Sequence, residues 1–121
     1  EFLCLHQRLD HYQDEINDQL DAVAERLIVI DGAPYSTLEE FAEHSGIQSI
    51  PGSYDATIDE RFARLIAGYR HLEKVYQEGI DTAGQEGDDS TQDILTGFHT
   101  TIEKRIWMLS AQRGHAPEID D

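Results

Sequence analysis

Two pairs of side chains suited to binding metals occur near the start of the sequence, each with a spacing of four residues. His6 is followed by Asp10, and Asp21 is followed by Glu25. Residues four apart lie on the same face of an α-helix, so each pair can present two ligand atoms to one cation. Imidazole nitrogen together with carboxylate oxygen suits iron, zinc or manganese. The pattern therefore indicates a transition-metal site, provided that a helix carries both pairs.

The two pairs cannot meet within one helix. At about 100° per residue the four positions fall within roughly a quarter of the helix circumference. The midpoints of the pairs, at positions 8 and 23, are nevertheless separated by roughly 22 Å at about 1.5 Å per residue. A second, antiparallel copy that crosses near Glu15 and Ile16 would bring the first pair of one subunit opposite the second pair of the other. Two equivalent sites between subunits would result.

A simpler interpretation of the same residues is a solvated helix edge. The sequence is acidic, and other pairs of potential ligands, His11 with Glu15 and Asp14 with Asp18, have the same spacing. Pairs of this kind arise by chance in a chain rich in carboxylates, where a run of charges usually faces solvent. Spacing alone leaves both interpretations open.

The element that must position the four side chains is a long amphipathic helix over residues 2–30. Apolar residues recur there at every third or fourth position, which is the period of a helix with one buried face. The helix is expected to stop at "DGAPYS", where Gly32 can adopt the left-handed conformation and Pro34 cannot continue the backbone hydrogen bonds. The apolar positions are Leu5, Leu9, Tyr12, Ile16, Leu20, Val23, Leu27 and Ile30.

Two further helices are predicted from capping residues and apolar period. Ser36 and Glu39 are spaced as a capping box that opens a short helix, "TLEEFAEHS". Thr57 and Glu60 form a second capping box, and the apolar stripe that follows predicts a long helix to about Ala83.

A third long helix follows the turn "GQEGDDS". Ser90 and Asp93 are spaced as its cap, and Gly114 and Pro117 mark its end. No strand pattern competes with these helices, so the fold class is all-α. Three long helices and a short crossing helix make a bundle with one side missing. The sequence also enters helical periodicity at Glu1 without an N-terminal cap, which predicts that a preceding first helix is absent from it.

Composition restricts the function. The 121 residues predict a single domain, and 39% hydrophobic residues suffice for a core. With 25 acidic and 9 basic residues the net charge is −16, which argues against binding of DNA and favours binding of cations.

The only cysteine, Cys4, cannot form an intrachain disulfide, which is compatible with a reducing cytoplasm. The longest aliphatic run, "LIVI", is far too short for a membrane span. A cytoplasmic protein without a membrane partner is expected.

Three stretches resemble the signature regions of the Dps family, the mini-ferritins, and especially its peroxide-resistance branch. They are "LHQRLDHYQDEINDQLDAVAERLI", "GAPYSTLEEFAEHSGI" and "IEKRIWMLSAQRGHAP", in the order that the family has them. The resemblance implies one ferritin-like domain over residues 1–121, a four-helix bundle with a short helix in the middle connection. It also implies a hollow homododecamer built through two-fold and three-fold interfaces. In that family, the ferroxidase ligands at the dimer interface match His6, Asp10, Asp21 and Glu25.

The function implied by this resemblance is an iron-storage ferroxidase. Such an enzyme oxidises Fe(II), preferentially with hydrogen peroxide, stores Fe(III) oxide in its cavity and protects the cell against oxidative damage. The family carries a further ligand histidine, beside a tryptophan, at the end of its first helix, and that region is not in this sequence. Two rival functions are a nucleoid-binding architectural protein and a truncated, inactive bundle that only self-associates.

Other charged residues have weaker assignments. The acidic turn "EGDDSTQD" can serve simply to cap a helix, but in related mini-ferritins this region lines a three-fold pore, which would assign Asp89 and Asp93 to the passage of iron. Gly84 stands where some relatives have a further acid. No partner is evident from spacing for the remaining histidines, which are taken as structural or exposed: His44, His71, His99 and His115.

Overall fold

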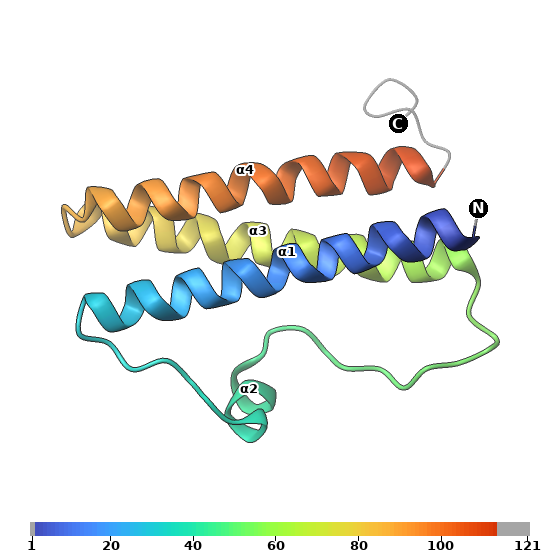
Figure 1. Cartoon of the computed structure of the whole chain (residues 1–121), viewed down its shortest axis with the longest axis horizontal. Helices are drawn as coiled ribbons and strands as arrows, with labels where there is room; N and C mark the ends of the chain where they lie inside the picture. The colour runs from blue at the N-terminus through green and yellow to red at the C-terminus, as the bar shows by residue number, and fades with distance from the viewer. Residues whose placement is uncertain (1, 114–121) are drawn as a thin grey trace. The chain divides into compact units, whose positions relative to one another are not determined.

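A computed structural model of the chain describes residues 2–113 (Figure 1). These residues form helices α1 (Phe2–Val29), α2 (Leu38–His44), α3 (Ile58–Gln85) and α4 (Asp89–Gln112), and no strand. The predicted all-α class, with three long helices and one short helix, is confirmed. None of the described helices combines the length and apolar character that a membrane span needs. The predicted stop signals Gly114 and Pro117 lie outside the described residues.

The chain divides into two compact units, residues 1–44 and residues 45–121. The first unit contains α1 and α2, and the second contains α3 and α4. Helix α1, which carries His6, Asp10, Asp21 and Glu25, therefore lies in a different unit from the pair of α3 and α4.

Helix α1 runs without interruption and ends in a Schellman turn. The Gly32 N–H donates to the Leu27 carbonyl at 2.7 Å, and the Asp31 N–H donates to the Ile28 carbonyl at 3.0 Å. The left-handed residue is Asp31, with φ 72°, so the prediction that Gly32 takes this conformation was wrong by one position. Asp tolerates the left-handed region better than most residues. Glycine is needed at position 32 for space, because a Cβ there would overlap the Leu27 side chain.

Helix α2 begins with a capping box one residue later than predicted. The Thr37 hydroxyl accepts a hydrogen bond from the Glu40 N–H at 3.1 Å. In return, the Glu40 carboxylate accepts from the N–H groups of Ser36 and Thr37 at 3.0 and 3.1 Å. The backbone amides of Ser36 and Thr37 thereby lower the pKa of the Glu40 carboxyl. Because α2 starts at Leu38, Thr37 with Glu40 has the capping geometry, and the predicted pair of Ser36 with Glu39 does not.

Helix α3 begins at the capping box that the sequence predicts. The Glu60 N–H donates to the Thr57 hydroxyl oxygen at 3.0 Å, and the Thr57 N–H donates to the Glu60 carboxylate at 3.1 Å. The helix continues to Gln85, slightly beyond the predicted end at Ala83.

The turn from α3 to α4 differs from the prediction at the cap. Gly87 takes the left-handed conformation with φ 74°, and the Asp88 N–H donates to the Ala83 carbonyl at 2.8 Å. The N-cap of α4 is Asp88, whose carboxylate accepts from the Thr91 N–H at 3.1 Å. The predicted cap of Ser90 with Asp93 was wrong, because Ser90 already lies inside the first turn of the helix.

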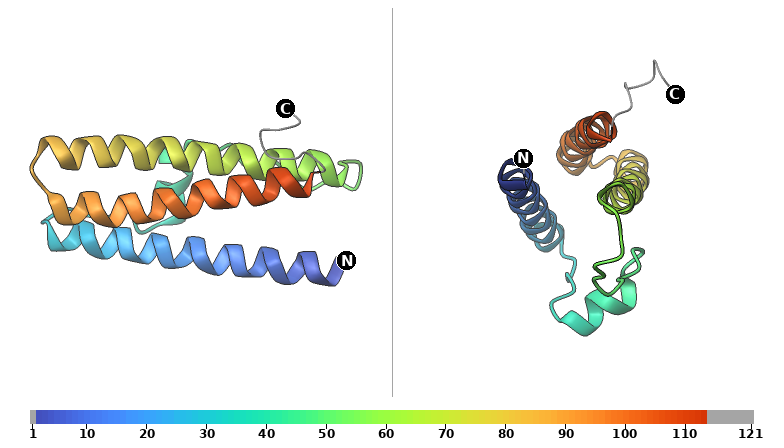
Figure 2. Two further views of the ribbon diagram at one scale, coloured as in Figure 1. Left: turned by 90° about the horizontal axis from the view of Figure 1, so that it is seen from above. Right: turned by 90° about the vertical axis from the view of Figure 1, so that its right-hand side faces the viewer.

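Helices α3 and α4 lie side by side and antiparallel along their length (Figures 1 and 2). At the end far from the turn, the Arg113 guanidinium forms two hydrogen bonds with the Asp59 carboxylate, at 2.8 and 3.0 Å. The side chains of Ile102 and Leu109 are 0% and 1% exposed. The hairpin therefore holds side chains of α3 at fixed positions opposite those of α4. Its buried apolar residues are Phe62, Ile66, Tyr69, Ala83, Ile102, Ile106 and Leu109.

Candidate metal centre

The first predicted pair, His6 with Asp10, meets on the surface of α1. The His6 Nε2 lies 3.7 Å from an Asp10 carboxylate oxygen, and the two side chains are 61% and 63% exposed. The side chains are thus close enough to chelate one ion after a small rotation, and they are accessible to solvent or to another copy of the chain. Helical spacing predicted this contact correctly.

The second pair, Asp21 with Glu25, lies further along the same helix, and both residues are exposed. Because α1 is a single helix from Phe2 to Val29, the two pairs stay roughly 22 Å apart along its axis. The structure does not bring the second pair to the first within one chain. The assignment of all four residues to a common metal site therefore stays a prediction, and it requires a second copy.

The residues predicted to line a pore, Asp89 and Asp93, are both exposed and lie four residues apart at the start of α4. The capping role belongs to Asp88, so neither of them is the N-cap. A local contact accounts for glycine at position 84. A Cβ there would lie 2.5 Å from the Gln92 Nε2, which donates to the Ile80 carbonyl at 3.2 Å. An acid at position 84 would therefore require the Gln92 side chain to move from its contact with α3.

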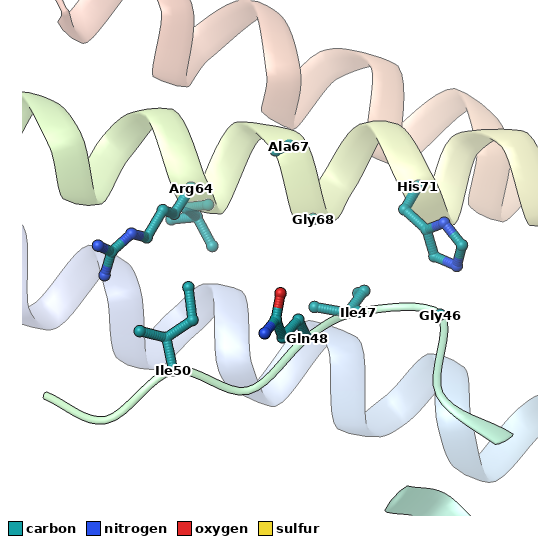
Figure 3. A pocket seen from close by; sticks show the side chains of 9 residues that line it. Gly46, Ile47, Gln48, Ile50, Arg64, Ala67, Gly68 and His71 are labelled. Carbon is teal, nitrogen blue, oxygen red and sulfur yellow. The ribbon is translucent and has the colours of Figure 1, made fainter. Parts of the chain in front are cut away.

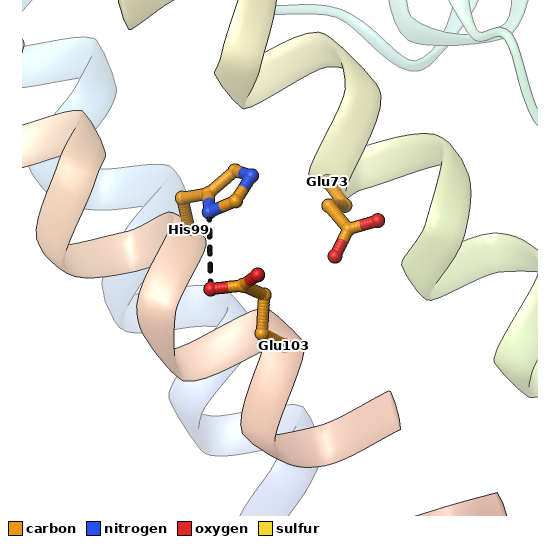
Figure 4. Close-up of side chains that lie close together, drawn as sticks. All are labelled: Glu73, His99 and Glu103. Atoms are coloured by element: carbon orange, nitrogen blue, oxygen red, sulfur yellow. Dashed lines mark ion pairs between the residues drawn. The ribbon is translucent and has the colours of Figure 1, made fainter. Parts of the chain in front are cut away.

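A third group of potential ligands was missed from the sequence. Glu73 on α3 lies beside His99 and Glu103 on α4, and one ligand atom from each of the three lies within 4.8 Å of the others (Figure 4). The His99 Nδ1 is 3.4 Å from a Glu103 carboxylate oxygen. Among the described residues, this is the group in which three potential ligands converge. The spacing of four that found His6 with Asp10 would have found His99 with Glu103, whereas Glu73 comes from another helix.

Tyr76, one turn beyond Glu73 on α3, is not suited to add an anionic oxygen to this group. Its ring is tilted by 48° against Phe98, with the ring centroids 5.8 Å apart. Burial raises the pKa of the Tyr76 phenol to about 12, so the hydroxyl stays protonated at neutral pH.

The other histidines have surroundings of different kinds. The His44 ring stacks on Tyr35 with centroids 4.2 Å apart and planes 6° from parallel. His71 lies against Gly46 at the edge of a depression of about 540 Å³ between the segment that follows α2 and the face of α3 (Figure 3). The lining residues of this depression include no carboxylate, so it does not fit a metal ion. His44 is exposed and His71 is half-buried, which agrees with the prediction of structural or exposed histidines, and His115 lies outside the described residues.

Comparisons with known proteins agree with this architecture. A model of the ferritin-like domain matches residues 1–119. A protein of Streptococcus suis called DNA protection during starvation protein is 43% identical over 118 residues, which cover 98% of this chain and 69% of that protein. The structure of Dps from Listeria innocua soaked with cobalt is similar with a TM-score of 0.92 and 40% identity, covering 96% of this chain and 74% of that one. The same protein soaked with zinc gives a TM-score of 0.90 at 40% identity, covering 96% and 77%.

Proposed function

The chain belongs to the Dps family of ferritin-like proteins, and from this premise we propose that it is a ferroxidase that oxidises Fe(II) and stores the ferric product. The predicted family and the predicted ferritin-like fold are both confirmed by the comparisons. The observation that carries the functional proposal is the unbroken helix α1, which presents two exposed ligand pairs too far apart to serve one site within a chain.

Each proposed site is shared between two copies of the chain. His6 and Asp10 of one copy face Asp21 and Glu25 of an antiparallel second copy, so that a two-fold axis generates two equivalent sites. His6 supplies a neutral nitrogen, Asp10 and Glu25 supply anionic oxygens, and Asp21 makes a terminal or water-mediated contact. Three carboxylates offset most of the charge of two ferrous ions. The same contacts would build the two-fold interfaces of a homododecamer.

The proposed reaction pairs two ferrous ions with one molecule of hydrogen peroxide. Each Fe(II) gives up one electron, the O–O bond of peroxide breaks and accepts both electrons, and two protons complete two molecules of water. Two ions held side by side deliver both electrons at one place, so that hydroxyl radical, the product of a single-electron step, is not released. Hydrolysis of the resulting Fe(III) yields the oxide that is stored.

We expect the stoichiometry of this reaction to be two Fe(II) oxidised per hydrogen peroxide. The measurement is anaerobic titration of the iron-loaded protein with peroxide, with a spin trap present to detect hydroxyl radical. The spin trap should give no signal of a hydroxyl radical adduct. Oxidation with peroxide should be faster than oxidation with dissolved oxygen. One Fe(II) oxidised per peroxide, with a trapped radical, would contradict a paired site. Equal rates with hydrogen peroxide and with dissolved oxygen would contradict the proposed preference for peroxide and leave the paired site unaffected.

We propose further that Asp89 and Asp93 attract iron to a three-fold pore of the assembly. The double substitution Asp89→Asn and Asp93→Asn should slow iron uptake severalfold at low ionic strength, because a ring of carboxylates concentrates cations in a narrow passage. The difference from the wild type should shrink as salt is added. The rate of iron incorporation after mixing with Fe(II) measures the effect.

A matched control for the pore removes the same charge elsewhere. Glu39 and Glu78 are exposed and lie on other helices. The double substitution Glu39→Gln and Glu78→Gln should leave uptake close to the wild-type rate. Equal slowing in both double variants would show an effect of net charge and no pore.

Protection of DNA, which the names of the relatives state, fits this proposal without direct contact to nucleic acid. A chain with a net charge of −16 offers few cations to phosphates, and phosphate contacts supply most of the affinity in non-specific binding. We therefore propose that protection acts through the removal of ferrous iron and peroxide. No described residue favours the nucleoid-binding alternative.

A further inference from the structure

The group formed by Glu73, His99 and Glu103 shares no residue with the site proposed on α1. It bridges two helices of one hairpin, since Glu73 projects from α3 while His99 and Glu103 project from α4 (Figure 4). The antiparallel packing of α3 on α4 fixes this meeting within a single chain. Assembly with other copies is not needed to form it.

The distances suit three ligands of one ion. Two ligands of a tetrahedral ion are about 3.4 Å apart when each lies about 2.1 Å from it. The His99 Nδ1 and the Glu103 oxygen are already 3.4 Å apart. The Glu73 carboxylate points toward both, and the ligand atoms of the three residues lie within 4.8 Å of one another (Figure 4). A rotation of one flexible carboxylate side chain would close the group around a cation.

The charges of the group favour a divalent cation. Within residues 2–113, no lysine or arginine forms an ion pair with Glu73, and the ion pair of Glu103 is with His99. A protonated imidazole supplies one positive charge for two neighbouring carboxylates, which leaves one negative charge uncompensated. A divalent ion beside a neutral imidazole compensates both. The His99 side chain is 18% exposed, so solvent screens its side of the group only weakly.

We propose that Glu73, His99 and Glu103 bind one divalent transition-metal ion that ties α3 to α4. One imidazole nitrogen and two carboxylates, without a thiolate, form a donor set for Zn(II), Fe(II), Mn(II) or Co(II). The Glu103 side chain is 57% exposed, so the remaining coordination positions open to water. The site is mononuclear and lies within one chain, unlike the proposed ferroxidase site.

Binding of Co(II) tests this proposal, because its visible absorption reports the ligands directly. The substitutions Asp10→Ala and Glu25→Ala are made first, so that the site on α1 loses two of its four proposed ligands and the variants below report on the new site. This background chain should bind one Co(II) with visible bands. Adding either His99→Gln or Glu73→Gln should weaken the affinity at least tenfold. Loss of Co(II) affinity in Glu73→Gln is the more informative result, since Glu73 lies on α3 and the other two ligands lie on α4.

The control is His71→Gln, which replaces another half-buried histidine that has no carboxylate neighbour in its depression. It should keep the affinity of the background chain. Equal affinity in the control and in the Glu73 and His99 variants would overturn the proposal, as would the absence of Co(II) binding below millimolar concentration. Failure of the ferroxidase proposal would not affect this result, because the background chain already lacks two of the four proposed ferroxidase ligands, Asp10 and Glu25.

A second readout guards against variants that fold poorly. Zn(II) should raise the unfolding temperature of the background chain, since an ion that binds only the folded state stabilises it. The same addition should have little effect on Glu103→Gln, an exposed substitution whose helix content can be checked by circular dichroism. An equal rise in that variant would overturn the proposal.

Discussion

An isolated heterodimer of an Asp10→Ala chain with a Glu25→Ala chain is expected to recover about half of the rapid ferrous oxidation that each substitution abolishes alone. Each substitution removes an anionic oxygen from every site of a homodimer, and a site that holds two cations depends on those oxygens. In the heterodimer, both defects fall in the same site, and the other site is complete. Stopped-flow measurement of Fe(II) oxidation on the purified heterodimer gives the answer.

A second heterodimer provides the matched control. When an Asp10→Ala chain is paired with a His6→Ala chain, the substitutions affect the same half-site on both copies, so both sites lack a ligand. No recovery is expected. Recovery in neither heterodimer would contradict a site shared in this way, and equal recovery in both would show that these residues do not act as ligands from opposite subunits.

Truncation of Ile102 to alanine is expected to lower the free energy of unfolding by about 2–5 kcal/mol, which is the usual cost of such a cavity in a tightly packed core. The Ile102 side chain is 0% exposed, in the middle of α4, where it packs in the core of the hairpin. A loss of this size is a large fraction of the roughly 5–15 kcal/mol that stabilises a typical domain. Urea unfolding followed by circular dichroism measures it.

The control substitution is Ile58→Ala, which makes the same chemical change at a side chain that is 61% exposed. Its effect should stay within about 0.5 kcal/mol. Both variants are measured at two protein concentrations, because assembly would add to the apparent stability. A similar small loss in both variants would mean that the core between α3 and α4 does not hold the hairpin together.

The helices could be predicted from the sequence because burial imposes a period. A stripe of apolar residues at every third or fourth position recovers α1 and α3 to within a few residues. The caps were less certain, since several neighbouring side chains can accept the same hydrogen bonds. Thr37 serves where Ser36 was expected, and Asp88 serves where Ser90 was expected. Which one caps depends on the backbone of the turn, and a pattern of residue types does not specify that.

The candidate sites differ in the same way. Some of their contacts lie within one helix and follow from the sequence, whereas others depend on how two helices pack. The contact of His6 with Asp10 follows from helical spacing alone. The meeting of Glu73 with His99 depends on the register of α3 against α4, which is set by the packing of side chains such as Ile102. Spacing along the sequence carries no information on that register. The arrangement of ligands between copies depends in addition on an interface that a single chain does not contain.

The shortness of the turn between α3 and α4 affects how the chain folds. Three residues, 86–88, separate the two helices, so their pairing closes a very small loop and loses little chain entropy. Contacts that are local in sequence form quickly. Because synthesis proceeds from the N-terminus, α4 is made after α3, and this hairpin is complete only once residue 112 has been made. Rapid packing of α4 against α3 then shortens the time during which their apolar faces are exposed and can aggregate.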